Sequence, residues 1–185
     1  LQTKEILCNK FISDTIESVL TQSLDEHEFI IVNDGSTDEA TAKVLSSYAN
    51  HDKRVRVISK ANEGLTRALI DGCSAAVGRY IARIDVGDVM LPFRLEKQAL
   101  VMNTYPDCHL VTSKVSLHAP DWEFLDVDEG APSADRPCRI VLDELDQRLT
   151  GDVPHHGSVM FRRSAYAEVG GYRSEFYFGQ DWDLW

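Results

Sequence analysis

The sequence predicts an α/β domain with a doubly wound, mostly parallel sheet flanked by helices. Three observations lead to this fold class. Short apolar runs of the buried-strand type alternate four times with segments of helical periodicity, the connections between them are short, and turn residues mark the breaks. With 185 residues, 43% of them hydrophobic, the chain suits one domain with a full core, so we interpret residues 1–185 as a single domain, truncated at both ends.

The elements of the first half follow in a regular order. Ile12, Ile16, Val19 and Leu20 have helical spacing, and the only candidate for the strand that should open such a domain is 5–8. Asp38 is the expected N-cap of one helix and Pro92 suits the first turn of another. The predicted elements after residue 28 are strands at 29–32, 55–58, 80–84 and 109–113, and helices at about 38–49, 65–76 and 92–105.

The regular alternation stops near residue 117. Residues 118–137 are polar and carry three prolines, which predicts a long loop. We expect a short helix over 139–148, a strand over 158–162 in a mixed part of the sheet, and a terminal helix that contains 183–185.

Composition and charge bound the function. The formal net charge of −11 repels polyanions, so no nucleic-acid partner is expected. No run of eighteen apolar residues exists that could span a bilayer. The four cysteines are far apart and form no Cys-x-x-Cys pair, which disfavours a zinc knuckle or a disulfide framework and fits a reducing, cytoplasmic location.

Three aspartates follow predicted strands. Asp34 comes after the strand at 29–32, Asp85 directly follows the strand at 80–84, and Asp88 lies three residues later. Ligands of an open α/β sheet bind outside the carboxyl ends of its strands, so we expect these carboxylates to share one edge. Clustered carboxylates need a compensating cation, and hard oxygen ligands suit Mg²⁺ or Mn²⁺ held together with substrate phosphates.

Five segments resemble, in the right order, segments of the family 2 glycosyltransferases. They are EFIIVNDGSTD at 28–38, NEGLTRAL at 62–69, GRYIA and DVGD within 78–98, HGSVMFR and GGY within 156–172, and GQDWDLW at 179–185. The resemblance covers the chain from about Asn9 onward. It implies a GT-A fold and an inverting transfer of a sugar from a nucleoside-diphosphate sugar, most simply a UDP-sugar, to an acceptor hydroxyl.

The resemblance also implies partners and site residues. The acceptor would be a saccharide or lipid-linked, in polysaccharide or glycoconjugate synthesis, with peripheral association of the full-length protein with the inner face of the membrane. Six residues would form the site: Asp34 at the nucleotide base, Arg67 at a phosphate, Asp85 and Asp88 at the metal and sugar diphosphate, His156 near the diphosphate or metal, and Asp181 as general base. Asp183 and His155 are the nearest competitors for the last two roles.

Each of these residues also has a structural interpretation. Asp34 could be a turn residue, Asp85, Asp88 and Asp181 could cap helices, His156 could be a structural histidine, and Arg67 could pair on a helix surface.

The chain departs from the family pattern at Gly87, where an aspartate is usual, and this glycine puts the metal site in question. The alternative function is therefore a non-catalytic module that binds sugar nucleotides with a degenerate metal site. A nucleotidyltransferase is disfavoured because no Gly-rich, basic phosphate loop is visible near the N-terminus.

Overall fold

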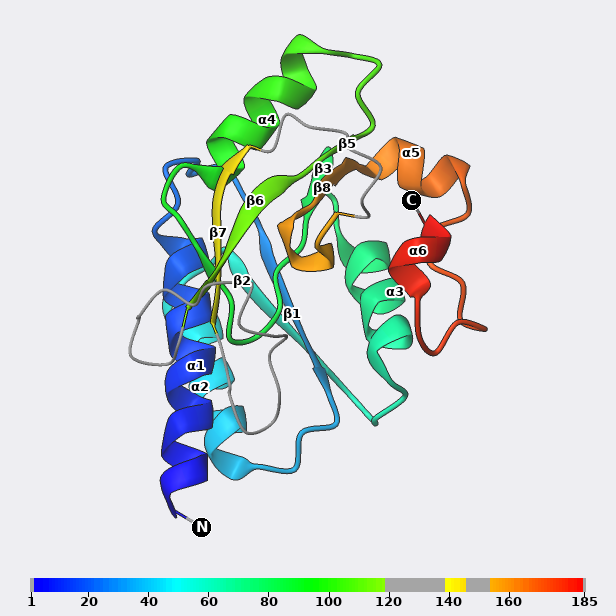
Figure 1. Cartoon of the computed structure of the whole chain (residues 1–185). Coiled ribbons are helices and arrows are strands. Elements are labelled where there is room, and N and C mark those ends of the chain that lie inside the picture. The colour runs from blue at the N-terminus through cyan, green and yellow to red at the C-terminus, as the bar shows by residue number, and fades with distance from the viewer. Residues whose placement is uncertain (1, 119–138, 146–153, 185) are drawn as a thin grey trace. The chain divides into compact units, whose positions relative to one another are not determined.

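The computed structural model describes residues 2–118, 139–145 and 154–184 and shows a mixed α/β chain (Figure 1). The chain divides into two compact units. The first unit comprises residues 1–9, 25–81 and 161–185, and the second comprises 10–24 and 82–160. The division falls within three elements: α1 (Gln2–Leu20), β3 (Tyr80–Ala82) and β8 (Met160–Arg162). The expectation that the chain acts as one domain stays a prediction.

The first unit contains the predicted parallel strands. β1 (Phe29–Asp34) pairs with β2 (Val55–Lys60) in parallel, from Phe29 opposite Val55 to Asp34 opposite Lys60. The helix α2 (Glu39–His51) connects them, and α3 (Leu65–Ala75) packs on β1 (Figure 1). Asp38 is the N-cap of α2 as predicted, because its two carboxylate oxygens accept hydrogen bonds from the backbone N–H groups of Ala40 and Thr41 at 3.1 and 2.9 Å.

Aromatic rings pack together in the later part of the first unit, which contains α5 (Arg163–Glu168) and α6 (Gln180–Leu184). The Tyr166 ring stacks on Phe161 with centroids 5.4 Å apart and meets Tyr172 edge-on at 5.5 Å. The Tyr166 hydroxyl accepts a hydrogen bond from the Tyr172 N–H at 3.1 Å. Gly171 has φ 69°, and a Cβ there would lie 2.5 Å from the Tyr166 ring, so this position requires glycine.

In the second unit, the later part of α1 is tied to residues 87–95. Ile12, Ile16 and Val19 are buried, which confirms the helical spacing. Three polar side chains of the segment 15–22 bond to that backbone: Thr15 Oγ1 donates to the Asp88 carbonyl at 2.8 Å, and Ser18 Oγ and Gln22 Oε1 accept from Met90 and Leu95 N–H, each at 3.1 Å. The predicted strand at 5–8 is wrong, since these residues continue the same helix toward its N-terminus.

The helix α4 (Arg94–Thr104) forms within the predicted range, but Pro92 lies two residues before it and not in its first turn. Proline lacks a backbone N–H and fixes its own φ, so it fits just before a helix whose first N–H groups have no partner within the helix. The buried face of α4 carries Arg94, Leu95, Gln98 and Met102. These residues form part of the interior of the second unit, together with Val159, which is fully buried.

The other strands that the structure describes form two three-stranded sheets, in the orders β3-β8-β5 and β4-β7-β6. Their further members are β4 (Val89–Met90), β5 (Leu110–Val111), β6 (Ser113–His118) and β7 (Arg139–Leu145). β7 pairs in parallel with β4 and antiparallel with β6, which makes this sheet mixed, as expected for the later part of the chain.

The helix predicted over 139–148 is wrong for residues 139–145, which form β7; residues 146–148 lie outside the described chain. Ile140 and Val141 are β-branched and favour strands, and pairing with two neighbouring strands uses the backbone hydrogen-bonding groups that a helix would have used internally.

Smaller differences concern the ends of elements. The strand expected at 109–113 is divided into β5 and β6, and residues 156–158 form a 3₁₀ turn, η2 (His156–Ser158), ahead of β8. His118, expected as the first residue of the long loop, ends β6 instead, and the other residues of the predicted loop, 119–137, lie outside the described chain. The terminal helix is α6.

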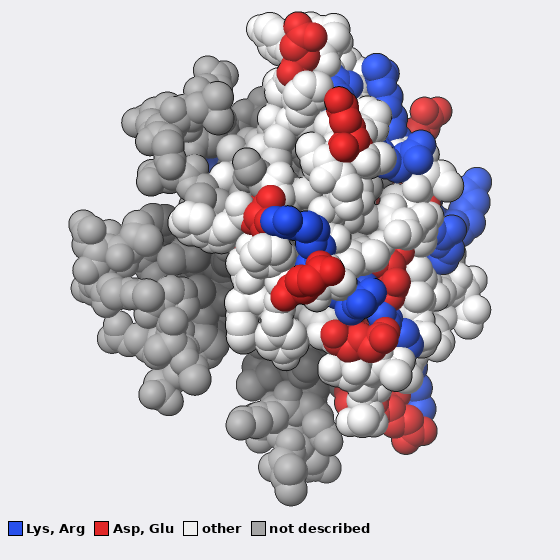
Figure 2. Space-filling view, turned by 90° about the vertical axis from the view of Figure 1, so that its right-hand side faces the viewer, with Lys and Arg blue, Asp and Glu red and all other residues white. Residues whose placement is uncertain are grey.

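Charged groups of both signs are interspersed on the face shown in Figure 2. Surface ion pairs in the first unit include Lys43–Glu39 at 3.2 Å and Lys60–Glu63 at 2.6 Å. None of the helices in the described part of the chain is both long and apolar enough to cross a membrane.

Candidate active site

Asp34 ends β1 and caps the N-terminus of α3. Its Oδ1 accepts from the Glu63 N–H at 3.0 Å and its Oδ2 from the Gly64 N–H at 2.8 Å. Glu63 and Gly64 lead directly into α3, of which Gly64 is the N-cap residue, so this carboxylate joins the end of β1 to the start of that helix. An ionised carboxylate offers about four lone pairs, which leaves acceptor capacity at Asp34 for a ligand.

Asp34 does not make the turn that follows β1. The side chain of Asn33 does so, because its Oδ1 accepts from the Ser36 N–H at 2.9 Å. Gly35 has φ 81°, and a Cβ at this position would lie 2.6 Å from the backbone nitrogen of Asn62. The turn after β1 therefore packs closely on the segment that leads into α3, and Arg67 extends from the first turn of that helix as an exposed side chain.

Asp181 and Asp183 both belong to α6 but have different surroundings. The Asp181 side chain is half-buried and has no hydrogen-bond or ion-pair partner among the described residues. Asp183 is engaged by Arg173, whose Nε donates to Oδ2 at 2.6 Å while its Nη2 pairs with Oδ1. Of the two candidates for a general base, Asp181 is thus the one whose carboxylate is open.

The second unit places Asp85 and Asp88 in one tight turn. The Asp88 N–H donates to the Asp85 carbonyl at 3.1 Å, and Gly87 has φ 102°, a value that suits the third residue of a type II turn. The Gly87 N–H donates to Thr15 Oγ1 at 3.0 Å. An aspartate at 87 would be strained in this conformation, so the departure from the family pattern has a backbone reason.

Asp85 is held by a buried arginine two residues before it. The Nη1 and Nη2 atoms of Arg83 donate to the two Asp85 oxygens, each at 2.7 Å. The Arg83 side chain is 7% exposed and that of Asp85 is 45% exposed. The fork fixes the orientation of the Asp85 carboxylate while one side of it still faces solvent.

Asp88 is buried with an unsatisfied oxygen. Its Oδ2 has no hydrogen-bond partner among the described residues. Burial, and secondarily the charge of Asp85, raises the pKa of Asp88 to about 7. A Cβ at Gly157 would lie 2.8 Å from this Oδ2, so the Asp88 carboxylate sits against the turn that carries His155 and His156.

Two buried polar residues of α4 hold this turn. Gln98 Nε2 donates to the Ser158 carbonyl at 2.9 Å, and Arg94 donates to the carbonyls of Arg83 and Val159 at 3.0 and 3.2 Å. Arg94 and Gln98 also bond to each other at 3.2 Å. Sequence reasoning did not single out Arg83, Arg94, Gln98 or Arg173; the signal for Arg94 and Gln98 was their i, i+4 spacing on the buried face of an amphipathic helix.

The second unit therefore brings Asp85, Asp88 and the His156 turn together, while Asp34, Arg67 and Asp181 belong to the first unit. Within the described residues, no three His, Cys, Asp or Glu side chains are grouped as a complete metal site. Mg²⁺ needs only one or two protein carboxylates when substrate phosphates supply further oxygens, and the unsatisfied Asp88 oxygen beside Asp85 fits that ligand set.

Comparison with known proteins gives the chain's relationships. The profile of glycosyl transferase family 2 matches residues 5–170. The candidate glycosyltransferase EpsE of Bacillus subtilis is 34% identical over 171 residues, which are 90% of this chain and 57% of EpsE. The chain thus spans little more than half the length of that relative.

Two solved structures share the fold. One is TarS of S. aureus, residues 1–349, in complex with UDP, with a TM-score of 0.65, 15% identity, and coverage of 94% of this chain and 49% of that one. The other is the mannosyltransferase PcManGT of Pyrobaculum calidifontis in complex with GDP-Man and Mn²⁺, with a TM-score of 0.63, 14% identity, and coverage of 90% and 45%. The fold is the GT-A fold that the sequence predicted. Because the family profile matches most of the sequence, from residue 5 to residue 170, this chain belongs to the family 2 glycosyltransferases.

Proposed function

We propose that the protein transfers a sugar from a UDP-sugar to an acceptor hydroxyl with inversion at the anomeric carbon. In this reaction the acceptor oxygen forms a bond to the anomeric carbon, the bond from that carbon to the diphosphate breaks, and UDP leaves with the electron pair. The acceptor hydroxyl gives its proton to a carboxylate. TarS and PcManGT were solved with UDP and with GDP-Man, which supports a sugar nucleotide as the donor.

The buried Asp88 oxygen without a partner is the observation that carries this proposal. A carboxylate in such surroundings is stabilised either by a proton or by a cation, and Asp85 supplies a second, oriented carboxylate beside it. We propose that Asp85 and Asp88 hold Mg²⁺ or Mn²⁺ together with the donor diphosphate, and that His156 lies near the diphosphate. The ion, when bound, offsets the negative charge that develops on the leaving diphosphate.

We propose that Asp34 contacts the nucleotide base, that Arg67 contacts a phosphate and that Asp181 is the general base. Asp34 is oriented by two backbone N–H groups, which suits an acceptor for the N–H of a uracil ring. Arg67 is exposed on the first turn of the same helix, where it can meet a phosphate. Asp181 has an open carboxylate, as a base that must reach an acceptor hydroxyl requires.

A second candidate function is a module that binds sugar nucleotides without catalysing transfer. Gly87, in place of the usual aspartate, and the engagement of Asp85 by Arg83 favour it. In either case, we propose a saccharide or lipid-linked acceptor or target and association of the full-length protein with the inner face of the membrane.

One experiment separates these functions. Binding is measured by thermal shift with UDP, GDP and ADP, in Mn²⁺ and in EDTA. Transfer is measured as the release of the nucleoside diphosphate from UDP- and GDP-sugars, with a panel of p-nitrophenyl glycosides as acceptors. Saturating ligand should stabilise the protein by about 2.7 kcal/mol at a hundredfold excess over the Kd. UDP binding with release supports the transferase. UDP binding without release with any acceptor supports the module, and no binding of any nucleotide rejects both.

A further inference from the structure

The 11-residue segment Arg173–Asp183, called here the 173–183 loop, carries Asp181 close to its end. The loop lies wholly within the first unit and within the described chain. It starts directly after Tyr172, which is buried and bonded to Tyr166. It ends in α6, which has only five residues. Because so short a helix is not stable by itself, contacts between the loop and its surroundings must hold it in position.

The first contact is a fork that joins the two ends of the loop. Arg173 Nε donates to Asp183 Oδ2 at 2.6 Å and Nη2 pairs with Oδ1, so both carboxylate oxygens are engaged. The Asp183 side chain is only 9% exposed, whereas that of Arg173 is 58% exposed. The arginine also lies over the Phe176 ring at 4.8 Å from its centroid, which holds the guanidinium in place. A carboxylate that is nearly removed from water depends on such a partner.

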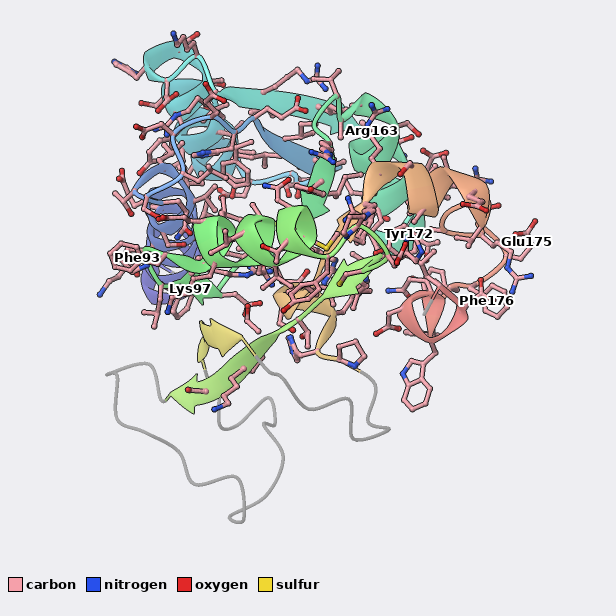
Figure 3. All side chains as sticks on the ribbon, turned by 90° about the horizontal axis from the view of Figure 1, so that it is seen from above. Phe93, Lys97, Arg163, Tyr172, Glu175 and Phe176 are labelled. Carbon is pink, nitrogen blue, oxygen red and sulfur yellow. The ribbon has the colours of Figure 1, made fainter. Side chains whose placement is uncertain are left out.

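The second contact connects the middle of the loop to the N-terminal end of α3, which Asp34 also contacts. The hydroxyl of Thr66, a buried residue in the first turn of α3, donates to the Phe176 carbonyl at 2.6 Å. The Tyr177 ring lies beside Gly64, where a Cβ would come within 3.2 Å of it. In Figure 3, the labelled residues Tyr172, Glu175 and Phe176 lead from α5 to α6.

From these contacts we infer that Arg173 and Asp183 are a positioning pair, which holds α6 so that Asp181 meets the acceptor hydroxyl. This inference rests on the proposed function and adds two residues to it. It also makes Asp183 a positioning residue and not a rival of Asp181 for the role of general base. A carboxylate whose two oxygens are occupied by one guanidinium is a poor proton acceptor, so Asp183 acts through Asp181.

The test compares three changes of the pair, Arg173→Ala, Asp183→Asn and Arg173→Lys, with one control, in the full-length protein. The control is Lys43→Ala, which breaks the exposed ion pair with Glu39 on α2 of the same unit. Three quantities are measured: hydrogen exchange of the amides in 179–184, where Asp183 N–H bonds to the Gly179 carbonyl; the Kd of UDP; and kcat for the donor and acceptor found above.

Arg173→Ala and Asp183→Asn should speed exchange in 179–184 and leave exchange in α3 unchanged. They should lower kcat at least about tenfold, since a misplacement near 1 Å costs up to about a hundredfold, while the Kd of UDP changes less than about twofold. Arg173→Lys keeps the positive charge but loses the bidentate contact with Asp183. Its exchange rate in 179–184 and its kcat should therefore lie between those of these variants and those of the parent. Lys43→Ala should match the parent in all three measurements.

Two results would overturn the inference. The first is parental exchange and parental kcat in Arg173→Ala and Asp183→Asn. The second is a parallel loss of UDP binding, of protection in α3 and of kcat, because a loss of that kind indicates general destabilisation and not positioning. If the parent protein itself releases no nucleoside diphosphate, the proposed function fails, and the exchange measurement alone decides whether the pair holds the loop.

Discussion

Asp34 and Asp88 both come after strands, yet the protein surrounds them in opposite ways. Asp34 is half-buried and both its oxygens accept backbone N–H groups. Asp88 is 5% exposed, and one of its oxygens has no partner among the described residues. Both oxygens of the first carboxylate thus have hydrogen-bond donors before any ligand arrives. The second carboxylate is destabilised in its charged form by burial and gains most from a proton or a cation. The comparison teaches that a shared sequence context does not imply a shared role.

The largest expected effect concerns a third carboxylate, Asp181, which has neither kind of environment. Asp181→Asn keeps the size of the side chain and removes the proton acceptor, so transfer should fall by about 10²–10⁴-fold. The Kd of UDP should stay near that of the parent, as measured by calorimetry. Glu175→Gln, an exposed carboxylate of the same loop, is the control and should keep parental rates. Parental transfer by Asp181→Asn would place the base elsewhere.

The next effect tests whether Asp34 binds a ligand or only caps a helix. Asp34→Ala should weaken UDP binding by about 1–3 kcal/mol, the usual range for losing a charged hydrogen bond, as measured by calorimetry. The matched control is Asp38→Ala, which removes the cap of α2 through the same kind of backbone contact. The control should lower the free energy of unfolding and leave the Kd of UDP unchanged. Equal Kd values in parent and Asp34→Ala would restrict Asp34 to capping.

The third effect addresses the cation at the Asp85–Asp88 turn. Mn²⁺ should increase the affinity for UDP, by a factor on the order of ten, which corresponds to about 1.4 kcal/mol. The double variant Asp85→Ala with Asp88→Ala should lose this increase and keep the affinity that the parent shows in EDTA. Titrations of UDP with and without Mn²⁺ measure both. Should the parent bind UDP equally in Mn²⁺ and in EDTA, the turn is not a metal site, and the non-catalytic module becomes the better interpretation.

The smallest effect is the pH dependence of stability that the buried Asp88 imposes. Its pKa is about 7 in the folded protein against 3.8 as the ordinary value, so between these values the folded state holds the extra proton. The contribution of Asp88 to stability is therefore most favourable below about pH 4, falls as pH rises, and is least favourable above about pH 7.

Asp88→Asn removes this buried charge. In EDTA at pH 8 it should raise Tm by a few degrees, roughly 3–6 °C, and at pH 4 it should change Tm little, as measured by calorimetric scans. Asp107→Asn, at an exposed position of the same unit, serves as the control. A lower Tm for Asp88→Asn at pH 8 would mean that the protein stabilises the charged form of the Asp88 carboxylate, against this prediction.

Local signals predicted the elements from β1 to α3 well. The apolar run before Asn33 gave β1, the cap at Asp38 started α2, and the periodicity after Gly64 gave α3. Each signal depends on neighbours within a few residues, namely the hydrogen bonds of a cap or the spacing of one helical face. The same holds for α4 after Pro92.

The sequence alone predicts the α/β class, the order of most elements, the family, and the six residues proposed for the site. Tertiary structure decided β7, because a short run with Ile140 and Val141 becomes a strand only when β4 and β6 supply the pairing partners. It also decided the state of each carboxylate. Asp88 is buried against Gly157, far along the chain, and Asp183 is held by an arginine ten residues away. Burial and pairing depend on neighbours in space, and no local pattern encodes them.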